Sequence, residues 1–452
     1  MTTWPARAES ASDIAIIGMA GFFPDAPDVG TYWHNIVQRH VAFTEVPARR
    51  WDWRLYYDAD PQAADKIVSR WGGFLPETVF DPMHFGIPPK ALNSVEAVQL
   101  LVLESTRLAL ADAGYQDRPF DRERTSVFIG AGAGENDLGQ MLSFRALMPH
   151  YFGQSAAEIL SGLKPAVPEW DTDVFTGVIT NIIAGRVANR FNLGGTSCTI
   201  DAACASALAA LRAGILDLRS GESDLAIVGG ADTLMSPFAY SCFSKVGALS
   251  PQGLSRPFDE QADGLVLGET VATVIIKRLS DARRDGDRVY AVIKGIAASS
   301  DGRAKSLTAP SSDGQRLALT RAYRNAGIDP KTVGLIEAHG TATKVGDQSE
   351  AAALKQFFSE HAAEARSCAV GSVKSQIGHA KCAAGIAALI KAVLALHHKV
   401  LPPTVGVEKP IADLMGPDNP LYLNTQTRPW IGDGRHPRRA GVSAFGFGGT
   451  NF

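Results

Sequence analysis

The stretch Thr196-Ser-Cys-Thr-Ile-Asp-Ala-Ala-Cys204-Ala-Ser-Ala-Leu208 predicts a short strand that turns sharply into a helix. The strand covers residues 196–200, and the helix is indicated by apolar residues at helical spacing, namely Leu208, Leu211, Ile215 and Leu218. Cys204 would then lie at the first turn of a buried helix, where free N–H groups and the helix dipole lower a thiol pKa. The competing interpretation is a small cysteine that only packs in an alanine-rich helix.

Composition narrows the class of protein. The chain has 452 residues, 45% of them apolar, which suffices for one large domain or two fused halves. A net charge of −3 argues against nucleic acid as a partner. The five cysteines form no metal or disulfide framework, so we expect no bound metal and a reducing, cytoplasmic location. We recognise no membrane span and no signal peptide.

Strand and helix patterns alternate in two rounds, which predicts an α/β fold with largely parallel sheets in two similar halves. We expect a flexible tail over 1–12, an N-terminal half over 13–270 and a C-terminal half over 271–452. Residues 135–176 are expected to be a long irregular insertion, of the kind that forms lids, interface arms or pocket walls. Two further segments are expected to serve packing: the aromatic excursion 49–73 and the glycines at 130, 132 and 134.

Two histidines stand where predicted strands end. His339 follows the strand over 333–336, and His379 follows the strand over 369–373. Active sites of open α/β sheets lie at such strand ends. Two imidazoles near a nucleophilic thiolate could donate hydrogen bonds to a developing enolate. Lys374 and Glu337 are placed to fix the tautomer and the pKa of these histidines.

Several motifs, in order along nearly the whole chain, resemble those of the β-ketoacyl-acyl-carrier-protein synthases, specifically the ketosynthase domains of type I polyketide and polyunsaturated fatty-acid synthases. The nucleophile motif is Asp201-Ala-Ala-Cys204-Ala-Ser206, and the histidine motifs are Glu337-Ala-His-Gly-Thr341 and Val373-Lys-Ser-Gln-Ile-Gly-His379. The others are Asp13-Ile-Ala-Ile-Ile-Gly-Met19, Arg256-Pro-Phe-Asp259, Ala262-Asp-Gly264, Gly346-Asp347 and Phe445-Gly-Phe-Gly-Gly-Thr-Asn451.

The resemblance implies the thiolase fold, an αβαβα five-layered sandwich of two similar halves, usually in a homodimer. It also implies decarboxylative condensation. Cys204 would take an acyl group from a carrier-protein thioester, and His339 and His379 would support decarboxylation of a malonyl extender, with Lys374 and Glu337 behind them. The N–H groups of Cys204 and Phe447 would form the oxyanion hole, and the Phe447 ring would gate access. No cofactor is expected to be bound intrinsically, because substrates are carried on the phosphopantetheine of acyl carrier protein.

Some positions depart from the family pattern and bear on the backbone near His339. Ala342 stands where the family usually has glycine, and Gln348-Ser349 replaces a usual Pro-Ile pair. Thr270 and Gly21 also replace more usual residues. The chain stops at Asn451-Phe452, within what is normally the start of a strand, so we expect a piece of a larger synthase with adjacent domains.

Three alternatives stay open. A non-elongating ketosynthase would transfer or gate acyl chains, but such domains typically lack the histidine found here at 339. A degradative thiolase would need a second cysteine near residues 445–451, where none occurs. A non-catalytic chain-length partner would lack Cys204. Acyl chain length and substituents, number of iterations, pathway product and the docking carrier protein do not follow from the sequence.

Overall fold

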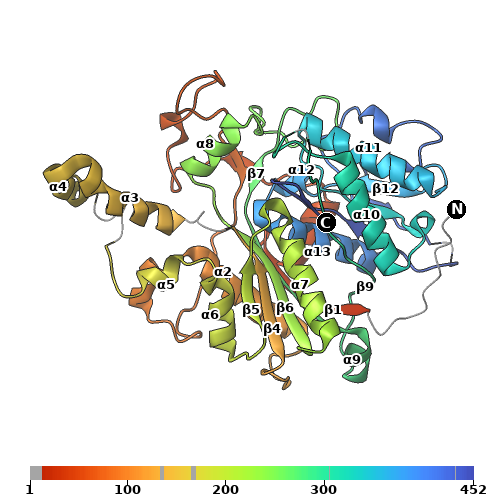
Figure 1. The fold of residues 1–452 in the computed structure, drawn as a ribbon, viewed down its shortest axis with the longest axis horizontal. Coiled ribbons are helices and arrows are strands. Elements are labelled where there is room, and N and C mark those ends of the chain that lie inside the picture. Colours follow the sequence, from red (N-terminus) through yellow and green to blue (C-terminus); the bar gives the residue numbers. More distant parts are fainter. Residues whose placement is uncertain (1–12, 133–136, 164–168, 305, 433) are drawn as a thin grey trace.

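Two β-sheets enclose a shared layer of helices in the computed structural model, which describes residues 13–132, 137–163, 169–304, 306–432 and 434–452 (Figure 1). The predicted flexible tail over 1–12 lies outside the described residues. The first sheet has six strands in the order β5-β4-β6-β8-β1-β9, and the second has four in the order β14-β12-β11-β16.

The first sheet is mixed, whereas largely parallel sheets were predicted. Its strands are β1 (Ile14–Phe22), β4 (Thr125–Gly130), β5 (Ser197–Ile200), β6 (Leu225–Asp232), β8 (Thr270–Arg278) and β9 (Ala291–Ile293). β5, β4 and β6 run parallel, while β8 is antiparallel to both β6 and β1, and β1 is antiparallel to β9. The long turn-rich connection over 233–266 returns the chain in the reverse direction, so the parallel prediction fails for β8, and it fails for β9 as well.

Helices cover both faces of this sheet. α2 (Ala97–Asp112) and α6 (Ile182–Phe191) pack on one face, and α7 (Ser206–Ser220) and α13 (Ala384–His398) pack on the other. All nine residues of β1 are buried. Because side chains alternate along a strand, Ile14 and Ile16 join the core with α7 and α13, whereas Ala15 and Ile17 join the core with α2.

The second sheet is entirely parallel, as expected for strands buried on both faces. It consists of β11 (Leu335–Glu337), β12 (Cys368–Gly371), β14 (Leu421–Leu423) and β16 (Ala440–Val442). On one face α10 (Ser312–Ala326) and α11 (Lys344–Glu360) cover Ile336, and on the other Leu335 packs in a cluster with Ala395 of α13. The molecule therefore has five layers, and α13 belongs to the middle one.

The middle layer contains an apolar run that the sequence patterns did not reveal as a possible membrane span. Among the described residues, Lys381–His398 alone is long and apolar enough to cross a membrane, with a mean hydropathy of 1.3. However, 83% of this run is buried inside the protein. A helix packed between two sheets must be apolar all round, so we interpret it as a core helix.

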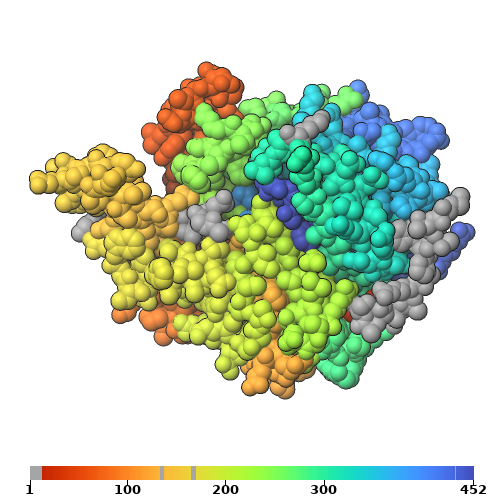
Figure 2. Space-filling view, viewed as in Figure 1, coloured from red at the N-terminus to blue at the C-terminus, as the bar shows by residue number. Residues whose placement is uncertain are grey.

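The insertion over 135–176 is largely helical where it is described, contrary to the irregular structure predicted. It contains α3 (Asp137–Phe152), α4 (Ala156–Gly162) and α5 (Val174–Val178). α3 and α4 project from the body as an arm (Figure 2). Proline at 149 and a weak apolar periodicity hid these helices from sequence reasoning. The arm carries exposed apolar side chains, including Phe144, Leu147 and Tyr151.

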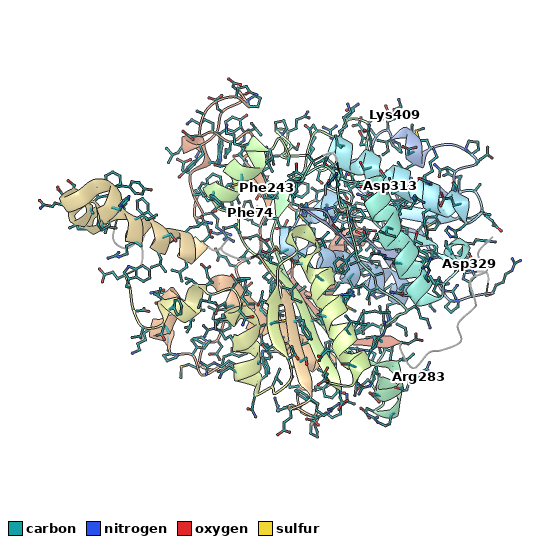
Figure 3. The ribbon with its side chains drawn as sticks, viewed as in Figure 1. Phe74, Phe243, Arg283, Asp313, Asp329 and Lys409 are labelled. Atoms are coloured by element: carbon teal, nitrogen blue, oxygen red, sulfur yellow. The ribbon has the colours of Figure 1, made fainter. Side chains whose placement is uncertain are left out.

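The aromatic excursion over 49–73 is packed, as predicted. Trp51, Trp53 and Tyr56 pack against a buried cluster that includes Phe74, and the ring of Phe243 joins the same cluster (Figure 3). Close backbone packing also holds at Gly130, where an added Cβ would lie 2.5 Å from the backbone nitrogen of Ala207. Of the other two glycines of that loop, Gly132 is described and Gly134 lies outside the described residues.

Smaller elements complete the fold: α1 (Val29–Val37), β2 (Phe43–Glu45), β3 (Trp71–Gly73), α8 (Pro237–Lys245), β7 (Leu267–Gly268), α9 (Leu279–Arg284), β10 (Ser299–Ser300), α12 (Lys374–Ile377), β13 (Val400–Leu401), β15 (Arg428–Pro429), β17 (Phe445–Gly446) and β18 (Thr450–Asn451). The division of the chain between residues 270 and 271 stays a prediction. β8 and β9, which follow or span that point, hydrogen-bond within the first sheet.

Candidate active site

Cys204 lies in a tight turn between β5 and α7. The turn is a single 3₁₀ turn, Ala203–Ala205, and α7 begins at Ser206, so the cysteine precedes the helix instead of starting it. Ala203 has a left-handed φ of 50°. The hydroxyl of Ser206 accepts from the N–H of Ala202 at 2.8 Å and donates to the carbonyl of Ala203 at 2.6 Å. The turn is thereby fixed, and it holds Cys204 buried.

The Phe447 loop packs directly on this turn. A Cβ added at Gly446 would lie 2.2 Å from the carbonyl oxygen of Ala202, so only glycine permits this approach. The backbone N–H of Phe447 donates a hydrogen bond to the Cys204 thiol, while the Phe447 side chain is 54% exposed. Gly448 follows with a φ of 97°. A backbone N–H group therefore points at the sulfur, and the side chain of Phe447 is open to solvent. The oxyanion hole and the gate stay predictions.

His339 is held by its backbone at the carboxyl end of β11. Its N–H donates to the Glu350 carboxylate at 2.8 Å, and the N–H of Gly340 donates to the same carboxylate at 2.7 Å. Its carbonyl accepts from the Lys374 ammonium at 2.5 Å. The Nδ1 atom of its ring is buried and has no hydrogen-bond partner among the described residues. The backbone N–H and carbonyl of His339 are thus both hydrogen-bonded, and Nδ1 of its ring is left to bind a ligand.

The tautomer of His379 follows from one backbone contact. The N–H of Lys381 donates to His379 Nδ1 at 2.9 Å. A neutral imidazole that accepts at Nδ1 carries its proton at Nε2. The backbone of His379 forms hydrogen bonds with the backbone of Val266 and Gly268, at β7, and these bonds fix its position. His379 is therefore a hydrogen-bond donor through Nε2.

The cysteine and the two histidines come together. Cys204, His339 and His379 each offer a side-chain atom within 4.8 Å of the others, and all three are buried. The two imidazole rings are nearly perpendicular, with centroids 5.3 Å apart. Such a group could also hold a metal ion. The positive charge of Lys374 acts on both histidines and lowers their pKa values, and the same charge would oppose a divalent cation.

Both imidazoles are held neutral. Burial lowers the pKa of His339 and His379 well below the ordinary value, and the charge of Lys374 lowers both further. Lys374 is itself buried, and burial lowers its pKa. The negative charges of Glu337 and Glu350 raise it in part. Neutral imidazoles can donate hydrogen bonds without carrying charge, which suits an oxyanion or enolate partner.

Glu337 shares no hydrogen bond with either histidine among the described residues, so it does not set their tautomer directly; it raises the pKa of Lys374, whose charge acts on both histidines. Its carboxylate forms a fully buried ion pair with Lys391 of α13 at 2.6 Å and accepts from the N–H of Val373 at 2.6 Å. It therefore holds the backbone that leads into Lys374. The tautomer of His379 is set by Lys381 instead.

The Cys204 pKa shifts in the direction opposite to the prediction. Burial raises the pKa of the thiol to about 11, and the charge of Lys374 and the N–H of Phe447 offset only part of this. The helix end was expected to lower the pKa, but Cys204 lies in the 3₁₀ turn that directly precedes α7 and is buried. The resting group is therefore a thiol at neutral pH.

Sequence reasoning missed Glu350 and Lys381, which hold the histidines, and Lys391, which pairs with Glu337. Lys391 could have been found, because a lysine in the apolar run 384–395 needs a buried partner. Glu350 lies three residues after Asp347 of a quoted motif, and its carboxylate reaches His339 across the turn that begins α11. Lys381 acts through its backbone N–H, for which no sequence signal exists.

The departure at Ala342 has a visible consequence. Ala342 is fully buried and has a left-handed φ of 62°, a conformation that glycine adopts without strain. Its N–H donates to the Asp347 carboxylate at 3.2 Å, and Asp347 also accepts from Phe258 at 2.6 Å. The loop after His339 therefore adopts a conformation that suits glycine, although alanine occupies position 342.

Known proteins match this fold and these motifs. The model of the β-ketoacyl synthase N-terminal domain matches residues 11–282, and the model of the C-terminal domain matches residues 290–408. The chain therefore belongs to the β-ketoacyl synthase family, an acyltransferase family with the thiolase fold, as its sequence motifs predicted.

Its relatives are large synthases and ketosynthase domains. The chain is 38% identical over 99% of its length to a polyunsaturated fatty acid synthase polypeptide of Thraustochytrium sp., of which it covers 16%. It is 37% identical over 97% of its length to the polyketide synthase PksN of Bacillus subtilis, of which it covers 8%. The chain thus spans a small part of these relatives.

Solved structures of ketosynthase domains also superpose on this chain. The ketosynthase from module 6 of the bacillaene synthase of Bacillus subtilis superposes with a TM-score of 0.85 at 34% identity, covering 97% of this chain and 71% of that one. The oxazolomycin ketosynthase domain of Streptomyces albus superposes with a TM-score of 0.84 at 32% identity, covering 97% and 73%.

Proposed function

We propose that this chain is an elongating ketosynthase that joins an acyl group to a malonyl-type extender with loss of CO2. The observation that carries the proposal is the convergence of one thiol and two neutral imidazoles, Cys204, His339 and His379, within 4.8 Å in a buried site. Two donors aimed at one region can stabilise a developing enolate, and the thiol can hold the acyl group meanwhile.

In the first step the Cys204 sulfur attacks the thioester carbonyl of an acyl carrier protein. A new carbon–sulfur bond forms to Cys204, the bond to the carrier sulfur breaks, and the departing sulfur takes up the thiol proton. The N–H groups of Cys204 and Phe447 would receive the negative charge on the carbonyl oxygen. Because the resting thiol pKa is about 11, proton loss is expected to accompany attack and not to precede it.

In the second step a malonyl thioester loses CO2, and the electron pair of the broken bond passes into an enolate. His379 would donate through Nε2 to the extender carbonyl, and His339 would supply the second donor. The enolate carbon attacks the acyl-cysteine carbonyl. The carbon–sulfur bond to Cys204 then breaks, which leaves a β-ketoacyl thioester on the carrier protein and releases Cys204 as a thiolate. One proton taken up from solvent then restores the thiol.

The proposed partners are an acyl carrier protein, adjacent domains of a larger synthase and a second copy of this chain. The longer relatives support adjacent domains. A homodimer is supported by β5, which is an edge strand of the six-stranded sheet with half-buried residues. We also propose a cytoplasmic location, as the free cysteines suggest.

The test is condensation by the purified protein. It should be incubated with an acyl thioester and malonyl-acyl carrier protein, and the carrier-bound product should be analysed by mass spectrometry. We expect a β-ketoacyl product longer by two carbons, and release of CO2. Acylation of Cys204 without any product would refute elongation and favour the non-elongating alternative, in which the domain only transfers or gates acyl chains.

A further inference from the structure

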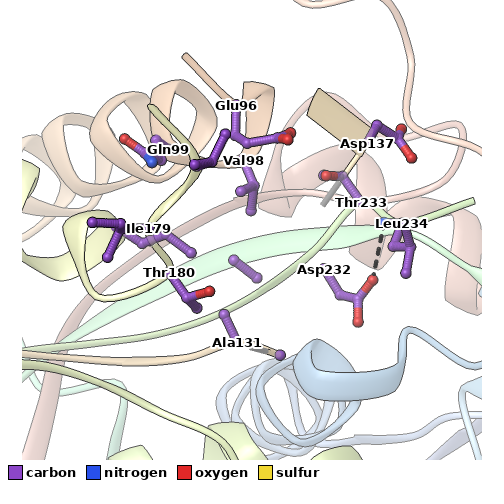
Figure 4. A pocket seen from close by; sticks show the side chains of 14 residues that line it. Glu96, Val98, Gln99, Ala131, Asp137, Ile179, Thr180, Asp232, Thr233 and Leu234 are labelled. Atoms are coloured by element: carbon purple, nitrogen blue, oxygen red, sulfur yellow. Dashed lines mark hydrogen bonds between the residues drawn. The ribbon is translucent and has the colours of Figure 1, made fainter. Parts of the chain in front are cut away.

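A buried ion pair lies next to the segment that carries His379. The carboxylate of Asp232, at the end of β6, faces the ammonium of Lys381 at 2.9 Å, and both residues are buried. Asp232 also accepts hydrogen bonds from the N–H groups of Leu234 at 3.1 Å (Figure 4) and of Cys382 at 3.3 Å. Because two charges lose their hydration when they are buried, such a pair adds little net stability. Its effect is better sought in the parts of the chain that it holds in place.

Lys381 has a backbone conformation that a lysine rarely adopts. Its φ is 45°, in the left-handed region, where the Cβ of any residue other than glycine crowds the backbone. In this conformation the Lys381 N–H donates to His379 Nδ1 at 2.9 Å, which leaves the proton of the neutral imidazole at Nε2. A lysine free to relax would leave the left-handed region, and its N–H would turn away from the imidazole. Contacts of the lysine side chain therefore have to hold the backbone in this conformation.

The ammonium of Lys381 is anchored at two points. It pairs with Asp232 of β6, and it donates to the carbonyl of Gly268 in β7 at 3.0 Å. The N–H of Gly268 in turn donates to the carbonyl of His379 at 3.0 Å. Lys381 is thus attached to the same residue that binds the backbone of His379. Since Asp232 also binds the N–H of Cys382, its carboxylate holds both the side chain of residue 381 and the main chain that follows it.

The two charges of the pair act on the nucleophile in opposite directions. Burial has the largest effect on the pKa of the Cys204 thiol and raises it; beyond burial, Asp232 raises this pKa and Lys381 lowers it. The intact pair therefore contributes little net charge near the sulfur, whereas either residue alone would contribute a full charge. Removal of both charges together should for this reason leave the reactivity of Cys204 nearly unchanged, and it should act on His379 through the backbone of residue 381.

We propose that Asp232 and Lys381 are positioning residues for His379: their ion pair holds Lys381 in its left-handed conformation and so keeps the imidazole proton at Nε2. The inference rests on the proposed function, in which Nε2 donates to the carbonyl of the extender. Neither residue is assigned a contact with the reacting atoms, so both act through the histidine. The pair should therefore serve decarboxylation and carbon–carbon bond formation, and it should be dispensable for the acylation of Cys204.

The test removes the pair without leaving a buried charge. In the double variant Asp232→Asn with Lys381→Met, the asparagine can still accept from Cys382, and the methionine keeps most of the length of the lysine side chain. The acylated protein is mixed with malonyl-acyl carrier protein at several concentrations. We expect the maximal rate of condensation to fall about 10- to 100-fold, because a small misplacement of an oriented donor has effects of this size. The half-saturating concentration should stay within about twofold, as expected for a group that acts in the transition state. Acylation of Cys204, followed by mass spectrometry of the intact protein, should change by less than about threefold.

Melting temperatures separate positioning from stability. Lys381→Met alone leaves the carboxylate of Asp232 buried without its cation and should melt well below the wild type, whereas the double variant should regain most of that loss. Condensation should not recover with it. The matched control is Lys277→Met, which breaks another buried pair, with Asp287 at 3.0 Å, near the opposite end of β8. It should lower the melting temperature and leave the ratio of the two half-reactions unchanged.

Three results would overturn the inference and leave the proposed function standing. They are condensation by the double variant at the wild-type rate, an equal loss in both half-reactions, and a condensation rate that follows the melting temperature across the variants. If Lys381→Met does not fold, the double variant compared with the wild type still decides between these outcomes. If the wild type itself forms no β-ketoacyl product, the proposed function fails, and this inference fails with it.

Discussion

The Glu350 carboxylate accepts a hydrogen bond from the backbone N–H of His339 at 2.8 Å. Its second oxygen accepts from the N–H of Gly340, so one side chain of α11 fixes the main chain on both sides of the His339–Gly340 bond. Burial raises the pKa of Glu350 to about 7, and these two N–H groups oppose the rise. The position of the imidazole therefore depends on a carboxyl group that never touches it.

Replacing Glu350 by glutamine should separate the two half-reactions. The amide keeps one acceptor and turns an N–H₂ group toward the other backbone N–H, so the loop that carries His339 shifts. We expect condensation to fall about 10- to 100-fold, because a small misplacement of an oriented group has effects of this size. Acylation of Cys204 should change by less than about threefold, since His339 is assigned to the second step. Single-turnover assays of each step measure both, with the exposed Glu360→Gln as the control; equal losses in both steps would contradict the assignment.

Alkylation of Cys204 should depend on pH as a buried thiol does. With its pKa raised to about 11, the thiolate fraction and the rate with iodoacetamide should rise nearly tenfold per pH unit from pH 7 to 10. Peptide mass spectrometry follows the rate, and the exposed Cys242 serves as an internal reference. A plateau below pH 8 would mean that Lys374 and the nearby helix end outweigh burial.

Substitution of the nucleophile and of one histidine should have different consequences. Cys204→Ala should abolish acylation, because no acceptor sulfur remains. His379→Ala should still be acylated but should condense at least about 100-fold more slowly, as expected when an oriented donor to an oxyanion is removed. His34→Ala on α1, which is exposed, should behave as the wild type. Condensation by either site variant at a wild-type rate would refute the assigned roles.

Asp347 should make the protein less stable as the pH rises. Burial raises its pKa to about 8 from 3.8, so the folded state keeps a proton that the unfolded chain releases. This contribution to stability is complete below about pH 4 and is lost progressively up to pH 8. Asp347→Asn cannot ionise, and its melting temperature should therefore vary less between pH 5 and 8 than that of the wild type. Differential scanning fluorimetry gives the comparison, and parallel curves would exclude Asp347 as a source of the pH dependence.

Ala342 should tolerate glycine and should not tolerate valine. Glycine relieves a left-handed φ by about 1 kcal/mol, while loss of a buried methyl group costs a similar amount. Ala342→Gly should thus change the free energy of unfolding by less than about 1 kcal/mol and leave condensation intact. Ala342→Val adds volume and a β-branch at positive φ, and should destabilise by about 2 kcal/mol or more. Urea unfolding measures both; a stabilised valine variant would contradict the strain argument.

Sequence patterns predicted the helices and strands whose buried residues recur at a regular spacing. The helix after Cys204, the strand before it and the strands that lead to His339 all lie within a few residues of their predicted bounds. They were found because apolar residues recur at the spacing that burial demands. The motifs that carried the family resemblance added the identity of the three residues that converge.

What could not be predicted depends on contacts between distant segments. The reversed direction of β8 is seen only in its antiparallel pairing with β1 and β6. A run of buried apolar residues in the sequence does not indicate in which direction a strand will run. The thiol pKa depends on how deeply the folded chain buries the sulfur. The partner of Glu337 is Lys391, which lies far along the chain on α13, and no local pattern connects the two residues.

α13 contacts both sheets and α7, so it has no surface that belongs to one half alone. Each half uses this helix as part of its own core. Recombining synthase domains requires a crossover point at which one chain can replace another. The boundary between the two halves is not such a point here. A hybrid with its crossover between β9 and β11 would have to match α13 of one parent to α7 and β8 of the other. Exchange of the whole catalytic unit avoids that mismatch.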